Sequence, residues 1–301
     1  MRVVPRTNQV LETEYSLLST RFDPESGILW TLLDQDSVPC VTPELLGDLH
    51  THHNQIANCG GRLPVDGGGS RDIRYAVMAS LTPGVFNLGG QLALFRQLIR
   101  NSNRDALLHY ATKCIDTFIP RYNHFNLPLA TITLIQGDAM GGGLEAALTS
   151  DIIIAERQSQ MGFPEILFNL FPGMGAYSVL ARKIGARLAE KMILSGKMYS
   201  AEELHVMGVV DIVVEKGEGE SAVYEYVRKQ EHRSNGFLAV QKVRNRFNPV
   251  TYQELMDITT VWVDAALKLS ERDLKVMDRF VRAQEKLFIA QPSEIRQQNI
   301  A

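Results

Sequence analysis

In the first half of the chain, segments with the hydrophobic pattern of a strand alternate with segments whose hydrophobic positions have the spacing of a helix. Residues 27–35 (GILWTLLDQ) combine β-branched and aromatic residues between turn formers, which predicts a strand. Residues 74–80 (RYAVMAS) form a short, nearly continuous apolar run, as expected of a buried strand. Two more runs predict strands, at 131–136 and 151–155. Helical periods separate these strands, so the pattern predicts an α/β fold with mainly parallel strands and right-handed crossovers.

The helix that follows Thr42 has the clearest beginning. Thr42 can cap it, Pro43 fits its first turn, and Glu44 suits the positive end of the helix dipole. Six positions then fall at helical spacing: Leu45, Leu46, Leu49, His52, His53 and Ile56. Similar spacing predicts further helices that begin near Leu92 and Asn103.

Other segments are less regular. The first 20 residues show no clear period, residues 59–71 are predicted to form a glycine-rich loop, and residues 83–90 a glycine-rich turn. After about residue 174 the pattern is nearly all helical, apart from 209–214. No Pro/Gly/Ser tract marks a hinge. We therefore expect a core at 1–200 and a mainly helical segment at 201–301.

Composition and charge narrow the class of protein. The chain has 301 residues, of which 45% are hydrophobic and 22% charged, which is ordinary for a globular protein. A net charge of −3 argues against a dedicated nucleic-acid binder. Three cysteines are too few for a disulfide framework and are expected to be reduced and partly buried. The first ten residues lack the apolar part of a secretory signal, and no apolar run reaches the ~18–20 residues that span a bilayer. We therefore expect a cytoplasmic, enzyme-sized protein without a membrane span.

Residues 136–145 (QGDAMGGGLE) follow a predicted strand and open a helix predicted over 141–150. Their glycines leave backbone N–H groups at the positive end of a helix dipole, where they can bind an anion or a developing oxyanion. A tight turn that needs glycine for positive φ explains the same glycines. No Lys-Ser/Thr pair follows them and the GxGxxG spacing is absent, so the segment is neither a phosphate loop nor a dinucleotide fingerprint.

Two glutamates lie in apolar segments near this loop. Glu145 stands one turn into the predicted helix among leucine and alanine, and Glu165 follows 20 residues later between phenylalanine, proline and isoleucine. Apolar surroundings raise the pKa of a carboxyl group toward the range that suits proton transfer. Two such carboxyls beside an oxyanion-type loop predict general acid–base chemistry on an activated carbonyl.

This combination resembles the crotonase (enoyl-CoA hydratase/isomerase) superfamily. The matching stretches are Asn-Leu-Gly-Gly90, Gly-Gly-Gly-x-Glu145, Pro164-Glu165 and Pro172-Gly173-x-Gly175, in order over roughly residues 25–215. The resemblance implies a crotonase-type β/α spiral core with a C-terminal helical extension, in which the segment 201–301 serves pocket closure and oligomerisation. It also implies that the N–H groups of Gly90 and Gly142 polarise a thioester carbonyl, beside the catalytic Glu145 and Glu165. Many members have Asp after the first oxyanion residue, where this chain has Gln91.

Within that superfamily, the chain is similar to the bacterial diffusible signal factor synthases. The stretches that carry this similarity are 39–46, 83–90, and the C-terminal helices with Trp262 and 277–284. The similarity implies a dehydratase that acts on 3-hydroxyacyl chains on acyl carrier protein and hydrolyses the thioester. The product would be a cis-2-unsaturated fatty acid used in quorum sensing. No cofactor is implied beyond the phosphopantetheine that carries the substrate, and no metal.

Four residues are candidates for binding the substrate: Met140, Gly141, Met174 and Trp262. Met140 precedes the glycine triplet and Met174 lies nine residues after Glu165, so both are expected at the mouth of an apolar acyl tunnel. Trp262 matches a tryptophan of the synthases and is expected to contact the acyl chain; packing of the core or of a subunit interface is the alternative. The resemblance also implies a homo-oligomer, either a trimer or a dimer of trimers, and leaves open a signalling regulator as a partner.

Other features have simpler explanations. His50 and His53 are spaced like a metal pair, but no cysteine or acidic ligand supports them, so solvated helix histidines are expected. No GxSxG elbow is present, so thioester cleavage is expected to use a carboxylate-activated water. The helix predicted over 271–286 either has a solvated charged face or docks an acidic carrier protein through Arg272, Lys275, Arg279, Arg282 and Lys286.

Two other functions stay open at this stage. The first is a generic enoyl-CoA hydratase or isomerase of fatty-acid metabolism. The second is a non-catalytic protein that binds acyl chains or a signalling partner. The presence of both Glu145 and Glu165 counts against the second, because a binding protein needs neither carboxyl group.

Overall fold

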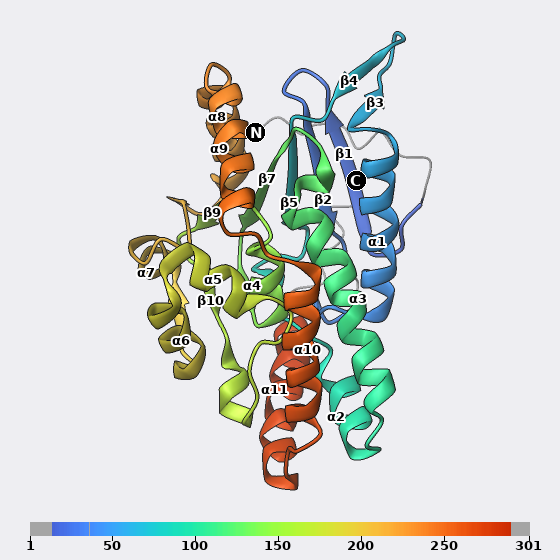
Figure 1. Ribbon diagram of the computed structural model, residues 1–301, viewed down its shortest axis with the longest axis vertical. Helices are drawn as coiled ribbons and strands as arrows, with labels where there is room; N and C mark the ends of the chain where they lie inside the picture. Colours follow the sequence, from blue (N-terminus) through green and yellow to red (C-terminus); the bar gives the residue numbers. More distant parts are fainter. Residues whose placement is uncertain (1–13, 36, 290–301) are drawn as a thin grey trace.

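The computed structural model describes residues 14–35 and 37–289 (Figure 1). The prediction about a secretory signal concerns the first ten residues, which lie outside this part of the chain. The larger sheet has six strands in the order β1-β2-β5-β7-β9-β12, and all neighbours except β1 and β2 are parallel. Its strands are β1 (Leu18–Asp23), β2 (Ile28–Leu33), β5 (Tyr75–Ser80), β7 (Ala130–Ile135), β9 (Ile152–Glu156) and β12 (Ile212–Val214). The prediction of an α/β fold with mainly parallel strands is confirmed.

A second sheet has four short strands in the order β11-β10-β8-β6. They are β6 (Val85–Asn87), β8 (Asp138–Met140), β10 (Gln160–Gly162) and β11 (Met198–Ser200). Three parallel strands of the larger sheet, β5, β7 and β9, are each followed along the chain by one of the short strands β6, β8 and β10. The chain therefore enters both sheets in each of three successive units.

The short strands correct the sequence interpretation. The predicted turn at 83–90 contains β6, and the predicted loop at 59–71 contains most of a hairpin of β3 (Arg62–Pro64) and β4 (Ser70–Asp72). Three residues are too few to show a period of two. β1 begins inside the first 20 residues, for which no period is visible, and pairs with β2 as an antiparallel edge strand.

The helices of the first half are α1 (Pro43–Asn58), α2 (Leu92–Arg100), α3 (Arg104–Tyr122) and α4 (Gly142–Ala147), with the short 3-10 helices η1 (His124–Asn126) and η2 (Pro164–Phe168). α1, α3 and α4 pack on one side of the larger sheet, whereas α2 packs against α3 and α11 (Glu271–Ile289) (Figure 1). In α1 the predicted cap is confirmed, because the Thr42 side chain accepts a hydrogen bond from Leu45 N, and all six predicted inward positions are buried. α4 ends at Ala147, three residues earlier than predicted.

The second half is mainly helical, as predicted. Its helices are α5 (Ala176–Ile184), α6 (Ala186–Ser195), α7 (Ala201–Val206), α8 (Gly219–Gln230), α9 (Ser234–Phe247), α10 (Tyr252–Ala266) and α11 (Glu271–Ile289). α8 packs on β7 and β9, α10 packs along α3, and α11 packs on α2 and η2. β12 lies beyond residue 200 and completes the larger sheet, while the proposed division at that residue stays a prediction. In the part of the chain that is described, no helix is long and apolar enough to cross a membrane.

Candidate active site

The predicted catalytic residues follow neighbouring strands of the four-stranded sheet. Gly90 comes after β6, Gly142 comes after β8, and Glu165 comes after β10. β6, β8 and β10 are parallel and adjacent, so their carboxyl ends lie at the same edge. Because neighbouring strands are ~4.8 Å apart, segments that are distant in sequence meet there.

The backbone N–H groups of Gly90 and Gly142 lie close together. A Cβ atom on Gly142 would lie 3.4 Å from Gly90 N, and one on Gly89 would lie 3.1 Å from Gly142 N. Gly89 is held on both sides, since its carbonyl accepts from Val41 N at 2.7 Å and its N–H donates to Asn87 Oδ1 at 2.9 Å. Among the hydrogen bonds of the described residues, neither the Gly90 nor the Gly142 N–H donates to a protein acceptor. Both donors are therefore free for a substrate oxygen.

Glu145 lies in α4 and is 3% exposed. Its Oε1 accepts hydrogen bonds from Met174 N at 2.8 Å and from Ala176 N at 3.0 Å. Burial raises the pKa of Glu145 from 4.5 to about 7, and the two N–H donors oppose that rise because they stabilise the anion. This carboxyl is therefore oriented by the start of α5 and changes its protonation near neutral pH.

Glu165 lies in η2 and points its carboxyl at the same region. Its Oε2 is buried, and no hydrogen bond to it occurs in the described part of the chain. Burial and, to a lesser degree, the nearby charge of Glu145 together raise the pKa of Glu165 to about 8. Gly141 makes room for this carboxyl: it has a φ of +50°, and a Cβ on it would overlap Glu165 Oε1.

A cavity of about 100 Å³ joins these groups, and its wall is mostly apolar. The lining residues come from α1, β5, α2, α3, α4, η2, α10 and the loops between them: Val41, Leu46, Leu49, His53, Met78, Gly90, Leu92, Phe95, Tyr110, Cys114, Thr117, Phe118, Arg121, Gly142, Glu145, Ala146, Thr149, Glu165, Phe168, Leu170, Phe171, Pro172, Gly173, Met174 and Trp262. Both glutamates and both oxyanion glycines thus face one apolar cavity, as ligand sites typically do.

Two of the four predicted substrate-binding residues line this cavity, Met174 and Trp262. Trp262 is also part of the core, because it packs edge-on against Phe95 with ring centroids 5.2 Å apart and lies against Gly173. Met140 ends β8, and neither Met140 nor Gly141 is among the described residues that line the cavity. Gly141 instead contacts the Glu165 carboxyl.

The prediction of solvated side chains for His50 and His53 is wrong for His53, which is buried on the inward face of α1, whereas His50 is partly buried. His52 is buried on the same face, as its helical spacing predicts, and Thr31 Oγ1 lies 2.7 Å from its Nε2. No cluster of metal-binding side chains occurs among the described residues. The three cysteines are free, as predicted: Cys40 is buried and Cys59 and Cys114 are partly buried.

Sequence reasoning missed several polar residues in the cavity wall. Tyr110, Cys114 and Arg121 all face the cavity from α3. They lie on one helical face together with Phe118, and this spacing was available from the sequence.

The site holds what acid–base chemistry on a thioester needs. Two adjacent N–H donors can hold a developing oxyanion, and two carboxyl groups that titrate near neutral pH can move protons on either side of it.

Comparisons with known proteins agree with this geometry. The profile of the family described as enoyl-CoA hydratase/isomerase matches residues 68–278. Mitochondrial methylglutaconyl-CoA hydratase of Mus musculus is 29% identical over 191 residues, which cover 64% of this chain and 58% of that protein. The chain thus spans a little over half the length of that relative. A probable mitochondrial enoyl-CoA hydratase 2 of Arabidopsis thaliana is 27% identical over 78% of this chain and 73% of that protein.

Solved structures share the fold. An enoyl-CoA hydratase from Bacillus halodurans has a TM-score of 0.70 at 20% identity, over 88% of this chain and 100% of that one. DspI of Pseudomonas aeruginosa has a TM-score of 0.62 at 24% identity, over 79% of this chain and 82% of that one. At these identities the likeness shows a crotonase-type α/β fold with C-terminal helices. The family profile covers well over half of the sequence, and so the chain belongs to the enoyl-CoA hydratase/isomerase family.

Proposed function

We propose that the protein removes water from a 3-hydroxyacyl thioester and then hydrolyses the thioester to release a 2-unsaturated acid. The observation that carries this proposal is the placement of Glu145 and Glu165 in one apolar cavity with two free N–H donors. The N–H groups of Gly90 and Gly142 hold the thioester oxygen while the α-proton leaves, and so stabilise the enolate.

Elimination needs one ionised and one protonated carboxyl. One glutamate takes the α-proton, and the other donates its proton to the departing 3-hydroxyl, which leaves as water. After the step the two carboxyls have exchanged protonation states, so the pair as a whole holds the same number of protons. Because the two pKa values are about 7 and about 8, the singly protonated pair is most populated between them.

Hydrolysis would use the same groups. The ionised carboxyl draws a proton from a water molecule that attacks the thioester carbon, and the two N–H donors hold the resulting oxyanion. The oxyanion then collapses, the C–S bond breaks, and the protonated carboxyl of the pair gives its proton to the departing thiol of the carrier. A serine nucleophile elbow is absent from the sequence, which supports a water-based step.

An acyl carrier protein is the proposed donor of the substrate. Five exposed basic residues follow each other on one face of α11 at spacings of three and four residues: Arg272, Lys275, Arg279, Arg282 and Lys286. None of them forms an ion pair with another described residue. α11 also packs on the cavity wall, because Phe280 meets Phe168 with ring centroids 5.5 Å apart. The stripe therefore offers an acidic carrier a positive surface beside the site.

The similarity of residues 39–46, 83–90 and 277–284 to the diffusible signal factor synthases supports a product with a cis double bond that serves quorum sensing. A cytoplasmic homo-oligomer, a trimer or a dimer of trimers, fits the same family. An exposed apolar face on α9 supports contact between subunits: Val240, Val243 and Phe247 lie on it, and Phe247 is 87% exposed. A signalling regulator as a further partner stays open.

The decisive experiment offers the protein one 3-hydroxyacyl chain on acyl carrier protein and on coenzyme A, with products identified by mass spectrometry. We expect loss of water and release of the free acid, faster from the carrier protein. Glu145→Gln and Glu165→Gln should form neither product, while Glu190→Gln, at an exposed position on α6, should behave like the unchanged protein. Dehydration without release, and without preference for the carrier, would favour a coenzyme A hydratase, as the curated relatives suggest.

The carrier surface has its own test. Lys275→Glu with Arg279→Glu should raise KM for the carrier-bound substrate about tenfold and leave KM for a short pantetheine thioester unchanged, because only the carrier meets the stripe. Lys242→Glu, an exposed position on α9, serves as the matched control. An equal effect on both substrates would exclude α11 as the docking surface.

A further inference from the structure

Arg121 is an unusual residue for the wall of an apolar cavity. It is 2% exposed, and within the described part of the chain only its Nη2 is bonded, donating to Ile132 O at 2.7 Å, Ser150 Oγ at 3.0 Å and Ala76 O at 3.4 Å. Its Nε is buried and has no partner among the described residues. A buried polar group without a partner loses its hydration and gains nothing in return.

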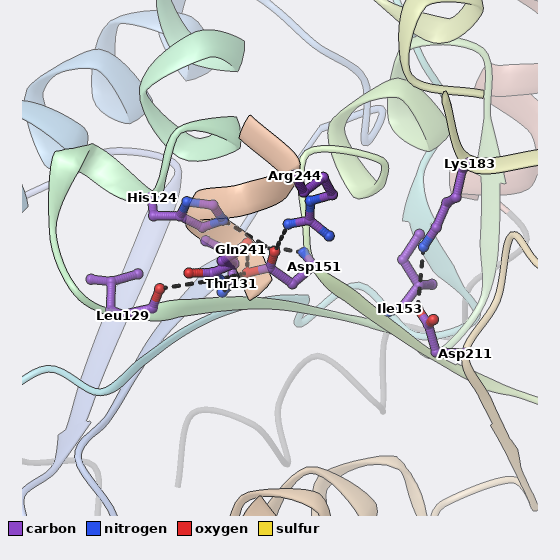
Figure 2. A network of polar contacts seen from close by, with 9 residues as sticks. All are labelled: His124, Leu129, Thr131, Asp151, Ile153, Lys183, Asp211, Gln241 and Arg244. Atoms are coloured by element: carbon purple, nitrogen blue, oxygen red, sulfur yellow. Dashed lines mark hydrogen bonds and ion pairs between the residues drawn. The ribbon is translucent and has the colours of Figure 1, made fainter. Parts of the chain in front are cut away.

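The charge of Arg121 is also unmatched. Burial lowers its pKa to about 10, so the guanidinium remains charged at neutral pH. The nearest compensating charge is Asp151, but both oxygens of that carboxylate are already in use (Figure 2). Oδ1 contacts His124 Nε2 at 3.1 Å and the Arg244 guanidinium, and Oδ2 accepts from Thr131 N at 3.0 Å. Two guanidinium groups therefore share one carboxylate, and no ion pair in the described chain includes Arg121.

His53 adds a second unpartnered atom near this end of the cavity. Its ring is buried and neutral, because burial and the charge of Arg121 hold its pKa well below the usual range. The other ring nitrogen, Nε2, donates to the Thr117 carbonyl, so Nδ1 is an acceptor, and it has no partner in the described residues. Polar groups that are left unsatisfied in a ligand cavity indicate a ligand that reaches them, and of these two groups only Arg121 can donate to an anion.

The position of Arg121 along α3 places it away from the reaction centre. Cys114 lies near Glu145, whose charge raises the pKa of its thiol, and Arg121 follows seven residues later on the same face. Seven residues of α-helix correspond to ~10 Å. An extended alkyl chain advances roughly 1.25 Å per C–C bond, so this span corresponds to about eight bonds. An acyl chain of about ten carbons that reacts at Glu145 would end beside Arg121.

We propose that this end of the cavity binds the terminal carboxylate of a dicarboxylic acyl chain, with the Arg121 guanidinium as its counter-ion. The inference rests on the proposed function, since it takes the cavity to be the acyl pocket, and it specifies the far end of the substrate. A carboxylate supplies the anion that the pair of guanidinium groups lacks and accepts hydrogen bonds from Arg121 donors that no protein group uses. A methyl terminus would leave the same charge buried and unpaired.

Binding of two unreactive probes tests this inference without any turnover. Each probe is an acyl-pantetheine analogue of about ten carbons in which a methylene replaces the thioester sulfur; one ends in a carboxylate and the other in a methyl group. Calorimetry should show the carboxylate probe bound on the order of 30-fold more tightly by the unchanged protein. Equal binding, or tighter binding of the methyl probe, would overturn the proposal.

Variants identify the residue responsible. Arg121→Met should abolish or reverse the preference, and Arg121→Lys, which keeps the charge on a shorter side chain, should retain part of it. Arg244→Met removes the other guanidinium of the Asp151 cluster without touching the cavity wall, so Asp151 is left to Arg121 and the preference should become smaller but not disappear. A preference that Arg121→Met leaves intact would place the carboxylate elsewhere and overturn the assignment. If neither type of 3-hydroxyacyl substrate loses water, the proposed function fails while the probe result still decides this inference.

Discussion

Replacing Glu165 with glutamine should change how the stability of the protein depends on pH. The unfolded carboxyl titrates near pH 4.5, whereas burial and Glu145 raise the folded pKa to about 8. Between these values the folded chain keeps a proton that the unfolded chain has released. The free energy of unfolding therefore falls as pH rises through this window and levels off above pH 8 or so. Glutamine has nearly the same shape and carries no charge, so in the variant position 165 does not lower the free energy of unfolding as pH rises.

The size of the effect follows from the two pKa values. Each pKa unit corresponds to ~1.36 kcal/mol, so ionising Glu165 in the folded chain costs roughly 5 kcal/mol. At about pH 5 the carboxyl is mostly protonated in the folded state, and Glu165→Gln should match the unchanged protein to within about 1 kcal/mol. At about pH 9 the variant should be more stable by several kcal/mol, a large part of the ~5–15 kcal/mol typical of a whole domain.

Urea denaturation at fixed protein concentration, at about pH 5, 7 and 9, measures this difference. Glu190→Gln is the matched control, because that side chain is exposed and does not line the cavity. Parallel stability curves for Glu165→Gln and the unchanged protein would refute the burial argument and, with it, the raised pKa on which the proposed acid–base role depends.

Catalysis provides four further tests. Glu145→Ala and Glu165→Ala should each lower dehydration ~10²–10⁴-fold with an unchanged circular dichroism spectrum, and full turnover would remove that residue from the mechanism. Gly142→Val should lower kcat ~10²–10³-fold and Tm only slightly, because its Cβ would lie 3.4 Å from Gly90 N, where the thioester oxygen must sit. A lower Tm with a normal kcat would show that Gly142 is needed only for the turn. The rate of dehydration plotted against pH should give a narrow bell-shaped curve with limbs near pH 7 and pH 8. A rate that does not change across that range would contradict a singly protonated pair of glutamates. Trp262→Ala should weaken turnover of long acyl chains more than short ones, and a uniform loss with lower Tm would make Trp262 purely structural.

The parts of the fold that depend on local sequence could be predicted. α1 has a capping threonine, a proline in its first turn and six inward positions, and the structure has all of these. The short strands β6, β8 and β10 could not be predicted, because three residues carry no readable period and are held by partners far away in the chain. Pairing in a sheet is set by the partner strand, which the local sequence does not contain.

The same distinction applies to the candidate site, where local motifs could be predicted and contacts between distant segments could not. The glycine loop and the two glutamates form spaced motifs, and the structure places them around one cavity. The charge imbalance at Arg121 was not visible, because it depends on Asp151, Arg244 and the carbonyls of two strands meeting at one point. The helical spacing of Tyr110, Cys114 and Arg121 was a usable signal, yet it could not say whether that face meets a core or a ligand.

The four-stranded sheet has a consequence for how such an enzyme can diversify. Gly90, Gly142 and Glu165 each lie two or three residues after a strand whose neighbours fix its position. Position 90 has no room for a side chain, because a Cβ there would lie 2.5 Å from Phe95, so position 165 is the one of the three that can vary. A mutation at position 165 would present a new functional group to the same substrate carbon without rebuilding the scaffold. Related sequences can therefore change their chemistry by a single substitution after β10, while the two glycine N–H groups after β6 and β8 stay in place.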